Sequence, residues 1–352
     1  MTTARRALLA ALSGAVLVLA FPGSGDQSWL AFGALAPLLV AVEGAPWRAS
    51  ALLGFLSAAV FWLGTMAWLA GTMVRYGDAP WPLAILVLLG LVGYLALYTA
   101  AFCAVLSRVP HRSPGLYAIV AGSLWVALEF LRTYLLTGFP WNLLGYSQYR
   151  NLPLIQVAAI TGVYGVSFVV AVVNVAAAQV ILRRPRFREF IAPVASASAV
   201  VALAVVAGWL APWRATPGSM APVALVQGSI EQGVKWDPDF QDATLETYRR
   251  LTLEAAGERP LLIVWPETAV PFFLSEDPRR REVEALARAV GAYLLVGAPD
   301  RSDGPPRNSA FLVSPEGRFL GRYDKRHLVP FGEYVPLRRW LFFVNPLVLL
   351  CQ

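Results

Sequence analysis

The first 214 residues consist of apolar stretches separated by short, mostly basic loops. The apolar stretches are Ala7–Phe21, Trp29–Val42, Ala51–Val74, Trp81–Leu106, Leu116–Leu136, Leu154–Leu182 and Phe190–Leu210. A helix that crosses a membrane needs about 20 apolar residues, a length that the last five stretches reach. The first two, at 15 and 14 residues, suit a hairpin that dips into the membrane or spans a thinned region. The pattern predicts a polytopic α-helical membrane domain of about seven transmembrane helices over residues 1–214.

Residues 215–352 have a different pattern, in which short apolar strands alternate with amphipathic segments. The expected strands are Val223–Val226, Leu261–Trp265, Tyr293–Val296, Asn308–Ser314 and Arg318–Tyr323. The expected helices are Pro238–Ala256 and a segment from Asp277, an N-cap followed by proline, to about Val290. The order of these elements predicts a layered α/β domain.

The charge distribution separates the same two regions. The chain has 57% apolar and only 14% charged residues, against roughly 25% charged residues in soluble domains. Residues 1–214 carry 13 Arg and 5 acidic residues, a balance of +8, whereas residues 215–352 have a balance of −1. The positive charge therefore lies in the loops between apolar stretches, which argues against a nucleic-acid-binding surface.

Arginine is also distributed unequally between alternate loops. Nine arginines fall in loops on one side and three in loops on the other. Because basic loops stay in the cytoplasm, the N-terminus is expected there. Seven crossings, an odd number, would then place residues 215–352 outside the cytoplasm.

Cysteine and histidine are scarce, with Cys103, Cys351, His111 and His327 as the full set. This scarcity gives no sign of a disulfide framework or of a zinc site. No cofactor or metal is expected.

Glu129 and Arg132 are the polar pair in the expected fifth span. Three residues apart, they share a helix face and can neutralise each other. From the sequence, a role in helix packing and a role in a substrate site are equally good interpretations.

Glu267 follows a buried strand in the segment Trp265-Pro266-Glu267-Thr268, at the strand edge where α/β sheets place their ligand sites. Lys325 follows the last expected strand. The chain has 27 Arg but only two Lys, Lys235 and Lys325, so we infer that lysine is kept where a compact ammonium is required.

Such a Glu and Lys can serve acyl transfer. The carboxylate removes a proton from a nucleophile, and the ammonium stabilises the developing oxyanion. The nucleophile itself is missing from this pair.

With these residues, the chain resembles the bacterial apolipoprotein N-acyltransferases, a membrane-bound branch of the nitrilase superfamily. The matching segments are Leu131-Arg132, Thr137-Gly138-Phe139-Pro140-Trp141, Gly145-Tyr146-Ser147-Gln148, Gln227-Gly228, Lys235-Trp236-Asp237-Pro238, Trp265-Pro266-Glu267-Thr268 and the segment from Lys325 to Glu333. They occur in the family's order and span essentially the whole chain. The resemblance implies that residues 215–352 are the N-terminal part of a nitrilase-like domain with α-β-β-α layers.

The resemblance also implies an activity. The family moves an acyl chain from a phospholipid to the N-terminal S-diacylglyceryl-cysteine of apolipoproteins, using a Cys-Glu-Lys triad and a thioester intermediate. By motif, Glu267 would be the general base, Lys325 the oxyanion stabiliser and Glu333 a supporting carboxylate. Trp236 would line the lipid pocket. The implied location is the bacterial inner membrane, with the phospholipid and the apolipoprotein as partners.

The family's cysteine nucleophile lies well downstream of the lysine, whereas Cys351 follows Lys325 by only 26 residues and is followed by Gln352. We therefore expect a C-terminally shortened member of the family in which Cys351 is not the nucleophile. Three other interpretations stay open: an inactive membrane protein that retains lipid or lipoprotein binding, a membrane-tethered amidase acting on small nitriles or amides, and a transporter.

Overall fold

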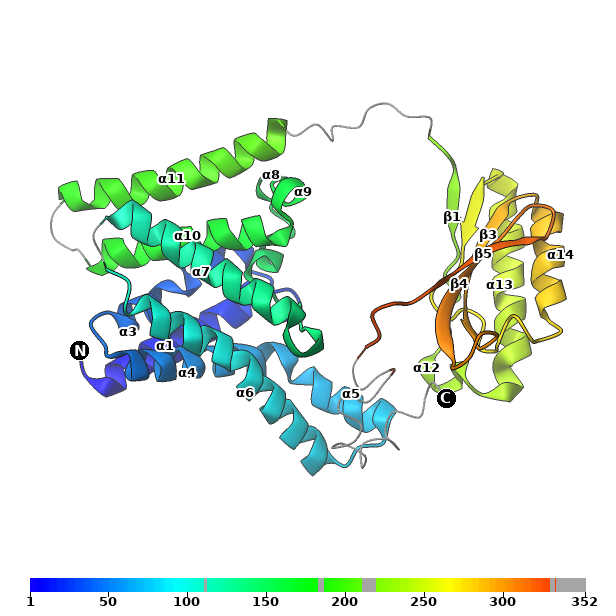
Figure 1. Ribbon diagram of the computed structural model, residues 1–352, viewed down its shortest axis with the longest axis horizontal. Helices are drawn as coiled ribbons and strands as arrows, with labels where there is room; N and C mark the ends of the chain where they lie inside the picture. The colour runs from blue at the N-terminus through cyan, green and yellow to red at the C-terminus, as the bar shows by residue number, and fades with distance from the viewer. Residues whose placement is uncertain (111–112, 183–186, 211–219, 330–332, 334–352) are drawn as a thin grey trace. The chain divides into compact units, whose positions relative to one another are not determined.

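The computed structural model describes residues 1–110, 113–182, 187–210, 220–329 and 333. The chain divides into two compact units, Met1–Ala215 and Thr216–Gln352. Figure 1 shows the first unit built of helices and the second built around a β-sheet. Each unit is considered separately below.

Six helices of the first unit are long and apolar enough to cross a membrane, within the residues described. They are α1 (Thr3–Ala20), α4 (Trp47–Met66), α6 (Trp81–Leu106), α7 (Pro114–Tyr134), α10 (Val163–Leu182) and α11 (Phe187–Leu210). The shorter elements are η1 (Ser28–Leu30), α2 (Ala31–Ala34), α3 (Ala36–Val42), α5 (Trp68–Gly77), η2 (Leu135–Thr137), η3 (Leu144–Gln148), α8 (Leu152–Ile155) and α9 (Ala158–Thr161).

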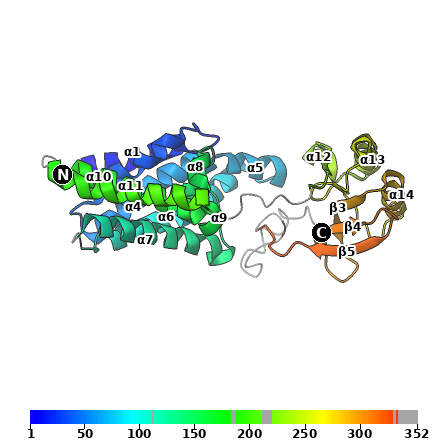
Figure 2. The same ribbon diagram turned by 90° about the horizontal axis from the view of Figure 1, so that it is seen from above.

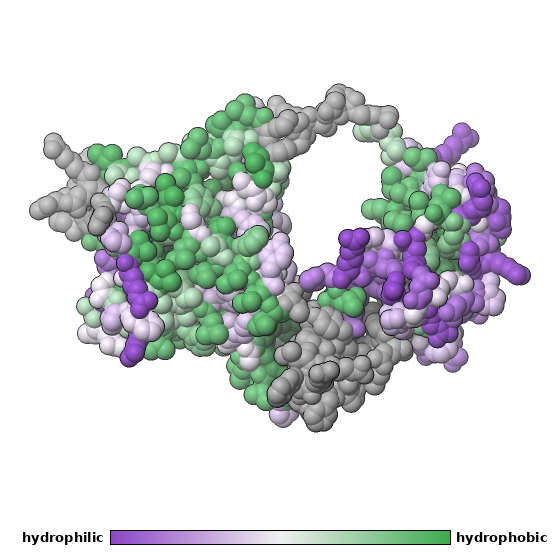
Figure 3. Space-filling model, in the orientation of Figure 1, coloured by the Kyte–Doolittle hydropathy of each residue, from purple (hydrophilic) through white to green (hydrophobic). Residues whose placement is uncertain are grey.

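Apolar side chains cover the surface of this unit. Leu52, Leu8 and Leu86 are 72%, 69% and 67% exposed. Figure 3 shows the contrast with the sheet unit, whose visible surface is largely hydrophilic. Leucines exposed on several helices are typical of a surface solvated by lipid. Together with the six long helices, they support the expected polytopic membrane domain.

The second expected span, Trp29–Val42, differs from the prediction because it is broken into η1, α2 and α3 instead of one helix. Pro37 has no N–H to donate to the carbonyl four residues earlier, which favours a break at this point. At the break, the Leu35 N–H and the Ala31 carbonyl, which would bond each other in a continuous helix, bond instead to a side chain from α10. The Leu35 N–H donates to Oδ1 of Asn174 (2.8 Å), and Nδ2 of Asn174 donates to the Ala31 carbonyl (2.7 Å). Asn174 is fully buried, so it satisfies backbone that water cannot reach.

The broken segment runs antiparallel to α1. Arg6, near the start of α1, donates to the carbonyl of Ala41 (2.6 Å), whereas Ser13, halfway along, donates to that of Ala34 (2.6 Å). Residues 28–42 therefore run alongside α1 in the opposite direction, from its C-terminal end to its N-terminal end.

The second unit holds a five-stranded sheet in the order β1-β2-β3-β4-β5. The strands are β1 (Val223–Leu225), β2 (Leu262–Val264), β3 (Tyr293–Asp300), β4 (Arg307–Val313) and β5 (Phe319–Asp324). The first three are parallel, and β4 and β5 pair antiparallel as the expected hairpin. The helical elements are α12 (Gln232–Lys235), η4 (Pro238–Phe240), α13 (Gln241–Ala255), η5 (Ala256–Glu258) and α14 (Arg280–Val290). The predicted fold class, a helical membrane domain followed by part of a nitrilase-like α/β domain, is confirmed.

Helices α13 and α14 pack on one face of this sheet (Figures 1 and 2). Leu245 and Tyr248 of α13, and Leu286 of α14, share a buried core with Ile263 of β2 and Leu294 of β3. Since side chains alternate along a strand, the neighbouring positions face the other way.

That second face is open in the described residues. Leu225 is 80% exposed, Tyr323 59% and Leu320 52%. The second face also carries the polar cluster considered below.

The bonds of Asn174 generate a stability prediction. Asn174→Leu keeps the size of the side chain but leaves the Leu35 N–H and the Ala31 carbonyl buried without this partner, at about 1–3 kcal/mol for each group. The melting temperature of Asn174→Leu, measured in detergent, should be clearly lower than that of the wild type. Gln156→Leu, which removes an exposed bond to the Leu152 carbonyl, is the control and should change stability by about 0.5 kcal/mol or less. Equal stability of the two variants would contradict this role of Asn174.

Candidate active site

Glu267 is held above the sheet by a tight passage of backbone. The chain leaves β2 through buried Trp265, and Thr268 adopts a left-handed conformation (φ 52°). Gly297 of β3 lies directly beneath: a Cβ at this glycine would lie 2.2 Å from the Pro266 carbonyl oxygen and 2.9 Å from the Cα of Glu267. Only glycine allows this approach, which sets the height of the Glu267 side chain over the sheet.

Lys325 follows directly after β5 and lies between two carboxylates. Its Nζ is 3.0 Å from Oε1 of Glu267 and 3.0 Å from Glu333. The Val329 N–H donates to Oε2 of Glu333 at 2.7 Å, which fixes that carboxylate from its other side. The structure thus brings together the three predicted residues Glu267, Lys325 and Glu333 in one cluster.

Asn308 is the residue of this cluster that sequence reasoning missed. It lies on β4, where its backbone carbonyl accepts from the Lys325 N–H (2.8 Å). Its Nδ2 donates to Oε1 of Glu267 and to Oε1 of Glu333 (3.2 Å). The available signal was the hairpin register, because Ser309 pairs with Asp324 and the next position places Asn308 opposite Lys325.

The predicted lipid-lining residue Trp236 lies just after α12 and is half-buried. Its neighbour Lys235 makes the contact with the cluster: Nζ of Lys235 lies 3.4 Å from the backbone carbonyl of Glu267. Both lysines of the chain therefore reach the same glutamate. The proposed role of Trp236 stays a prediction.

The pKa values of Lys325 and Glu333 are shifted by the groups around them. Burial alone lowers the pKa of Lys325, but its hydrogen bonds to Glu333 and Glu267, and their charges, outweigh burial and hold the pKa above its usual value. Burial raises the pKa of Glu333, yet the bonds from the Val329 N–H, Lys325 and Asn308 leave it below its usual value. Lys325 is thus an ammonium and Glu333 a carboxylate at neutral pH.

The remaining candidate residue, Cys351, lies outside the described residues. Among the described residues the cluster therefore consists of two carboxylates, an ammonium and an amide, without a thiol. In the same described part of the chain, His, Cys, Asp and Glu side chains form no group of three that could hold a metal ion.

Glu129 and Arg132, the polar pair of the membrane unit, form a separate group of buried contacts. Oε1 of Glu129 accepts from the Leu144 N–H (2.7 Å) and from Nε1 of Trp125 (2.9 Å), and Arg132 donates to the Trp141 carbonyl (2.8 Å). Both side chains thereby tie the loop after α7 back to the helix that carries them. Of the two interpretations left open by the sequence, these contacts favour packing.

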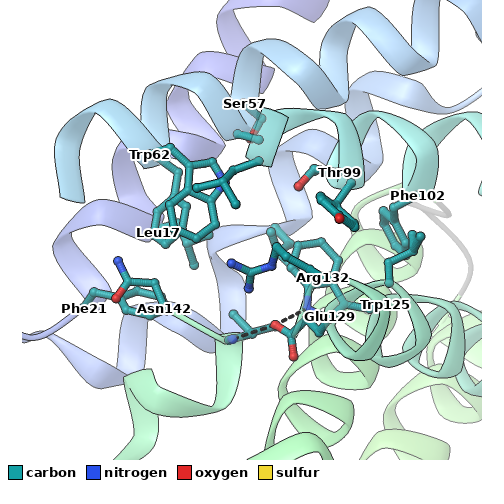
Figure 4. Close-up of a pocket in the computed structure, with 17 residues that line it drawn as sticks. Leu17, Phe21, Ser57, Trp62, Thr99, Phe102, Trp125, Glu129, Arg132 and Asn142 are labelled. Carbon is teal, nitrogen blue, oxygen red and sulfur yellow. Dashed lines mark hydrogen bonds between the residues drawn. The ribbon is translucent and has the colours of Figure 1, made fainter. Parts of the chain in front are cut away.

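A cavity lies beside the pair. Figure 4 shows Arg132 and Glu129 among its lining residues, with Trp62 and Thr99 also in the wall. The guanidinium lies 4.8 Å from the Trp62 ring centre. The free space inside is about 40 Å³, room for a few water molecules.

Comparisons with known proteins cover both units. Residues 13–176 match the family model of the apolipoprotein N-acyltransferase N-terminal domain, and residues 222–345 match the carbon-nitrogen hydrolase model. The apolipoprotein N-acyltransferase of Geobacter metallireducens is 42% identical over 97% of this chain, and that of Azotobacter vinelandii is 38% identical over 95%. The chain belongs to the apolipoprotein N-acyltransferase family. The predicted family is therefore confirmed.

The chain spans about two thirds of the length of these curated relatives, 67% and 65% respectively. Among solved structures, an amidase of the nitrilase superfamily from Nesterenkonia is 23% identical, with a TM-score of 0.26. The matched region covers 32% of this chain and 46% of the amidase, too little to argue from.

The close approach of Gly297 to the backbone of Pro266 and Glu267 leads to a prediction about the polar cluster. Gly297→Ala should push the Glu267 backbone upward, destabilise the unit by roughly 1–3 kcal/mol and weaken the contact to Lys325. With less negative charge nearby, the pKa of Lys325 should fall, so it should react faster with an amine-selective reagent at about pH 9.

Gly321→Ala is the matched control, because a Cβ at Gly321 of β5 meets no atom within 4 Å. Mass spectrometry of the labelled peptides separates Lys325 from Lys235. Identical labelling rates and stabilities for the two glycine variants would contradict the tight passage.

Proposed function

We propose that this protein is an N-acyltransferase that transfers an acyl chain from a membrane phospholipid to the N-terminal S-diacylglyceryl-cysteine of apolipoproteins. The name shared by the curated relatives supports the reaction class. The observation that carries the proposal is the Lys325 ammonium, held 3.0 Å from a carboxylate on each side.

The two carboxylates have different surroundings that suit different roles. The Glu267 side chain is 62% exposed, whereas that of Glu333 is only 15% exposed. An exposed carboxylate can take a proton from a nucleophile, so Glu267 is assigned as the general base. Glu333 accepts a hydrogen bond from the Val329 N–H and pairs with Lys325, which fixes the position of the ammonium.

Lys325 is assigned to stabilise the oxyanion that forms when the acyl carbonyl is attacked. Its raised pKa keeps the charge in place over the working pH range. The reaction also needs a thiol nucleophile, which the family resemblance places downstream of Lys325. Trp236 is assigned to the lipid-binding wall on the same resemblance. No step of this scheme uses a cofactor.

The membrane location supports a lipid donor. The first unit carries six helices able to cross a membrane. Segment 28–42, which runs antiparallel to α1, is assigned as a seventh pass, so that the number of passes is odd. Together with the excess of arginine in alternate loops, this supports a multi-pass protein of the bacterial inner membrane with its sheet domain outside the cytoplasm.

The roles of Glu267 and Lys325 lead to a prediction about turnover. Glu267→Gln keeps the shape but removes the base, and Lys325→Arg keeps the charge but replaces a compact ammonium with a planar fork. Each should lower lipoprotein N-acylation by roughly 10²–10⁴-fold. The measurement is the acylation state of lipoproteins, by mass spectrometry, in a strain depleted of its own enzyme and supplied with a gene that joins this sequence to the family's nucleophile segment downstream of Lys325.

Glu276→Gln is the control for both variants, since it breaks only the exposed pair with Arg301. It should acylate like the wild type. Near-wild-type acylation by Glu267→Gln or Lys325→Arg would refute the assigned roles.

The odd number of passes leads to a prediction about orientation. A reporter enzyme that is active only outside the cytoplasm should be active when fused after Pro217 and inactive when fused after Arg186. The opposite result at both sites would exclude the proposed orientation, and equal activity at both would exclude a crossing by α11.

A further inference from the structure

Asn308 occupies the central position of the polar cluster. It lies on β4, between β3 and β5, on the face of the sheet that α13 and α14 leave open. The cross-strand bond from the Lys325 N–H to its carbonyl places the two side chains next to each other on that face. Its position is therefore set by the hairpin register.

The amide of Asn308 contacts both carboxylates. Nδ2 donates to Oε1 of Glu267 and to Oε1 of Glu333, and Oδ1 lies 3.4 Å from the Thr268 hydroxyl. The same two oxygens also accept from Lys325. Asn308 and Lys325 thus form two parallel bridges between the same two glutamates.

These bridges leave the two oxygens of Glu267 in different environments. Oε1 accepts from both Asn308 and Lys325, whereas Oε2 accepts no hydrogen bond from the residues that the structure describes. When hydrogen bonds fix one oxygen of an exposed carboxylate, the other oxygen keeps a constant orientation and can accept a proton from that direction. Fixing that direction is what a general base requires.

The charge balance shows why a neutral donor is needed here. The charged side chains joined by hydrogen bonds within the cluster, Glu267, Glu333 and Lys325, sum to −1, with the Lys235 ammonium nearby at the Glu267 backbone carbonyl. Like charges at the separation of the two carboxylates repel. A second cation between the glutamates would compete with Lys325, whereas a neutral amide supplies two N–H donors without changing the charge. Asn308 bonds directly to Glu267, Glu333 and Lys325, and Lys235 reaches the backbone of Glu267. At the same strand end, Arg307 pairs with Asp324 instead.

We propose that Asn308 is a positioning residue of this site, which bridges Glu267 and Glu333 so that Oε2 of Glu267 is presented to the group that loses its proton. This inference rests on the proposed function for its catalytic meaning. The bridge itself can be tested separately.

The first experiment compares Asn308→Asp with Asn308→Ala in the lipoprotein acylation assay. Aspartate keeps the shape but replaces the N–H donors with a third negative charge, and alanine removes the donors without adding charge. We expect a 10–100-fold loss for Asn308→Ala and a larger loss for Asn308→Asp at neutral pH. Arg307→Gln, on the adjacent position of β4, is the control and should stay within about twofold of the wild type.

The second experiment needs no enzymatic activity. Because the chain has only two lysines, amine labelling of the purified full chain as a function of pH, read by mass spectrometry, reports Lys325 separately from Lys235. Asn308→Asp should raise the labelling midpoint of Lys325 by at least one pH unit relative to Asn308→Ala, because the new carboxylate favours the ammonium.

Each outcome decides a different point. An active Asn308→Asp with an unchanged Lys325 midpoint would overturn the bridge, because a residue that matters only by shape tolerates this isosteric change. Should Asn308→Asp fail to fold, Asn308→Ala within twofold of Arg307→Gln would overturn the bridge as well. A wild-type gene that includes the family's nucleophile segment and acylates no lipoprotein would refute the proposed function, while the labelling midpoints would still decide the bridge.

Discussion

The ammonium of Lys325, held between two carboxylates, is the interaction on which the arrangement of the candidate site depends. Its partners come from separate parts of the chain, with Glu267 after β2 and Glu333 after the β4–β5 hairpin. Neither carboxylate could sit so close to the other without a charge or donor between them. Lys325 and Asn308 supply these groups, and both are placed by one hairpin register. The pairing of β4 with β5 therefore fixes the relative positions of the residues in the candidate site.

The backbone beneath Glu267 is the second requirement of the site. Gly297 on β3 allows the chain after β2 to approach within a distance that any Cβ would forbid. The carbonyl of Gly297 then accepts from the Val270 N–H, which closes the turn that holds Glu267. The rigid part of the site is thus built on strands, and the exposed carboxylate projects from it. Such an arrangement restricts a reactive group without burying it.

In the membrane unit, buried polar side chains bond the backbone of irregular segments. Where Pro37 interrupts the helix, the buried amide of Asn174 replaces the lost backbone bonds. Where the chain leaves α7, Glu129 and Arg132 bind the backbone of the returning loop. In lipid an unpaired N–H or C=O has no water to bond with, so each irregular segment needs a polar side chain nearby. These contacts give Asn174, Glu129 and Arg132 a role in folding.

By itself the sequence determined the two-part architecture, the family and three members of the polar cluster. Apolar stretches of membrane length, the alternation of strands and helices, and the motifs around Glu267 and Lys325 are all local patterns, so they can be read without coordinates. Only the tertiary structure decided what depends on contacts between distant segments. It showed that the span Trp29–Val42 is broken, that Glu129 of α7 bonds the backbone of the following loop, and that Asn308 belongs to the polar cluster. Side-chain partners that meet across strands or helices leave no periodic signal in the chain.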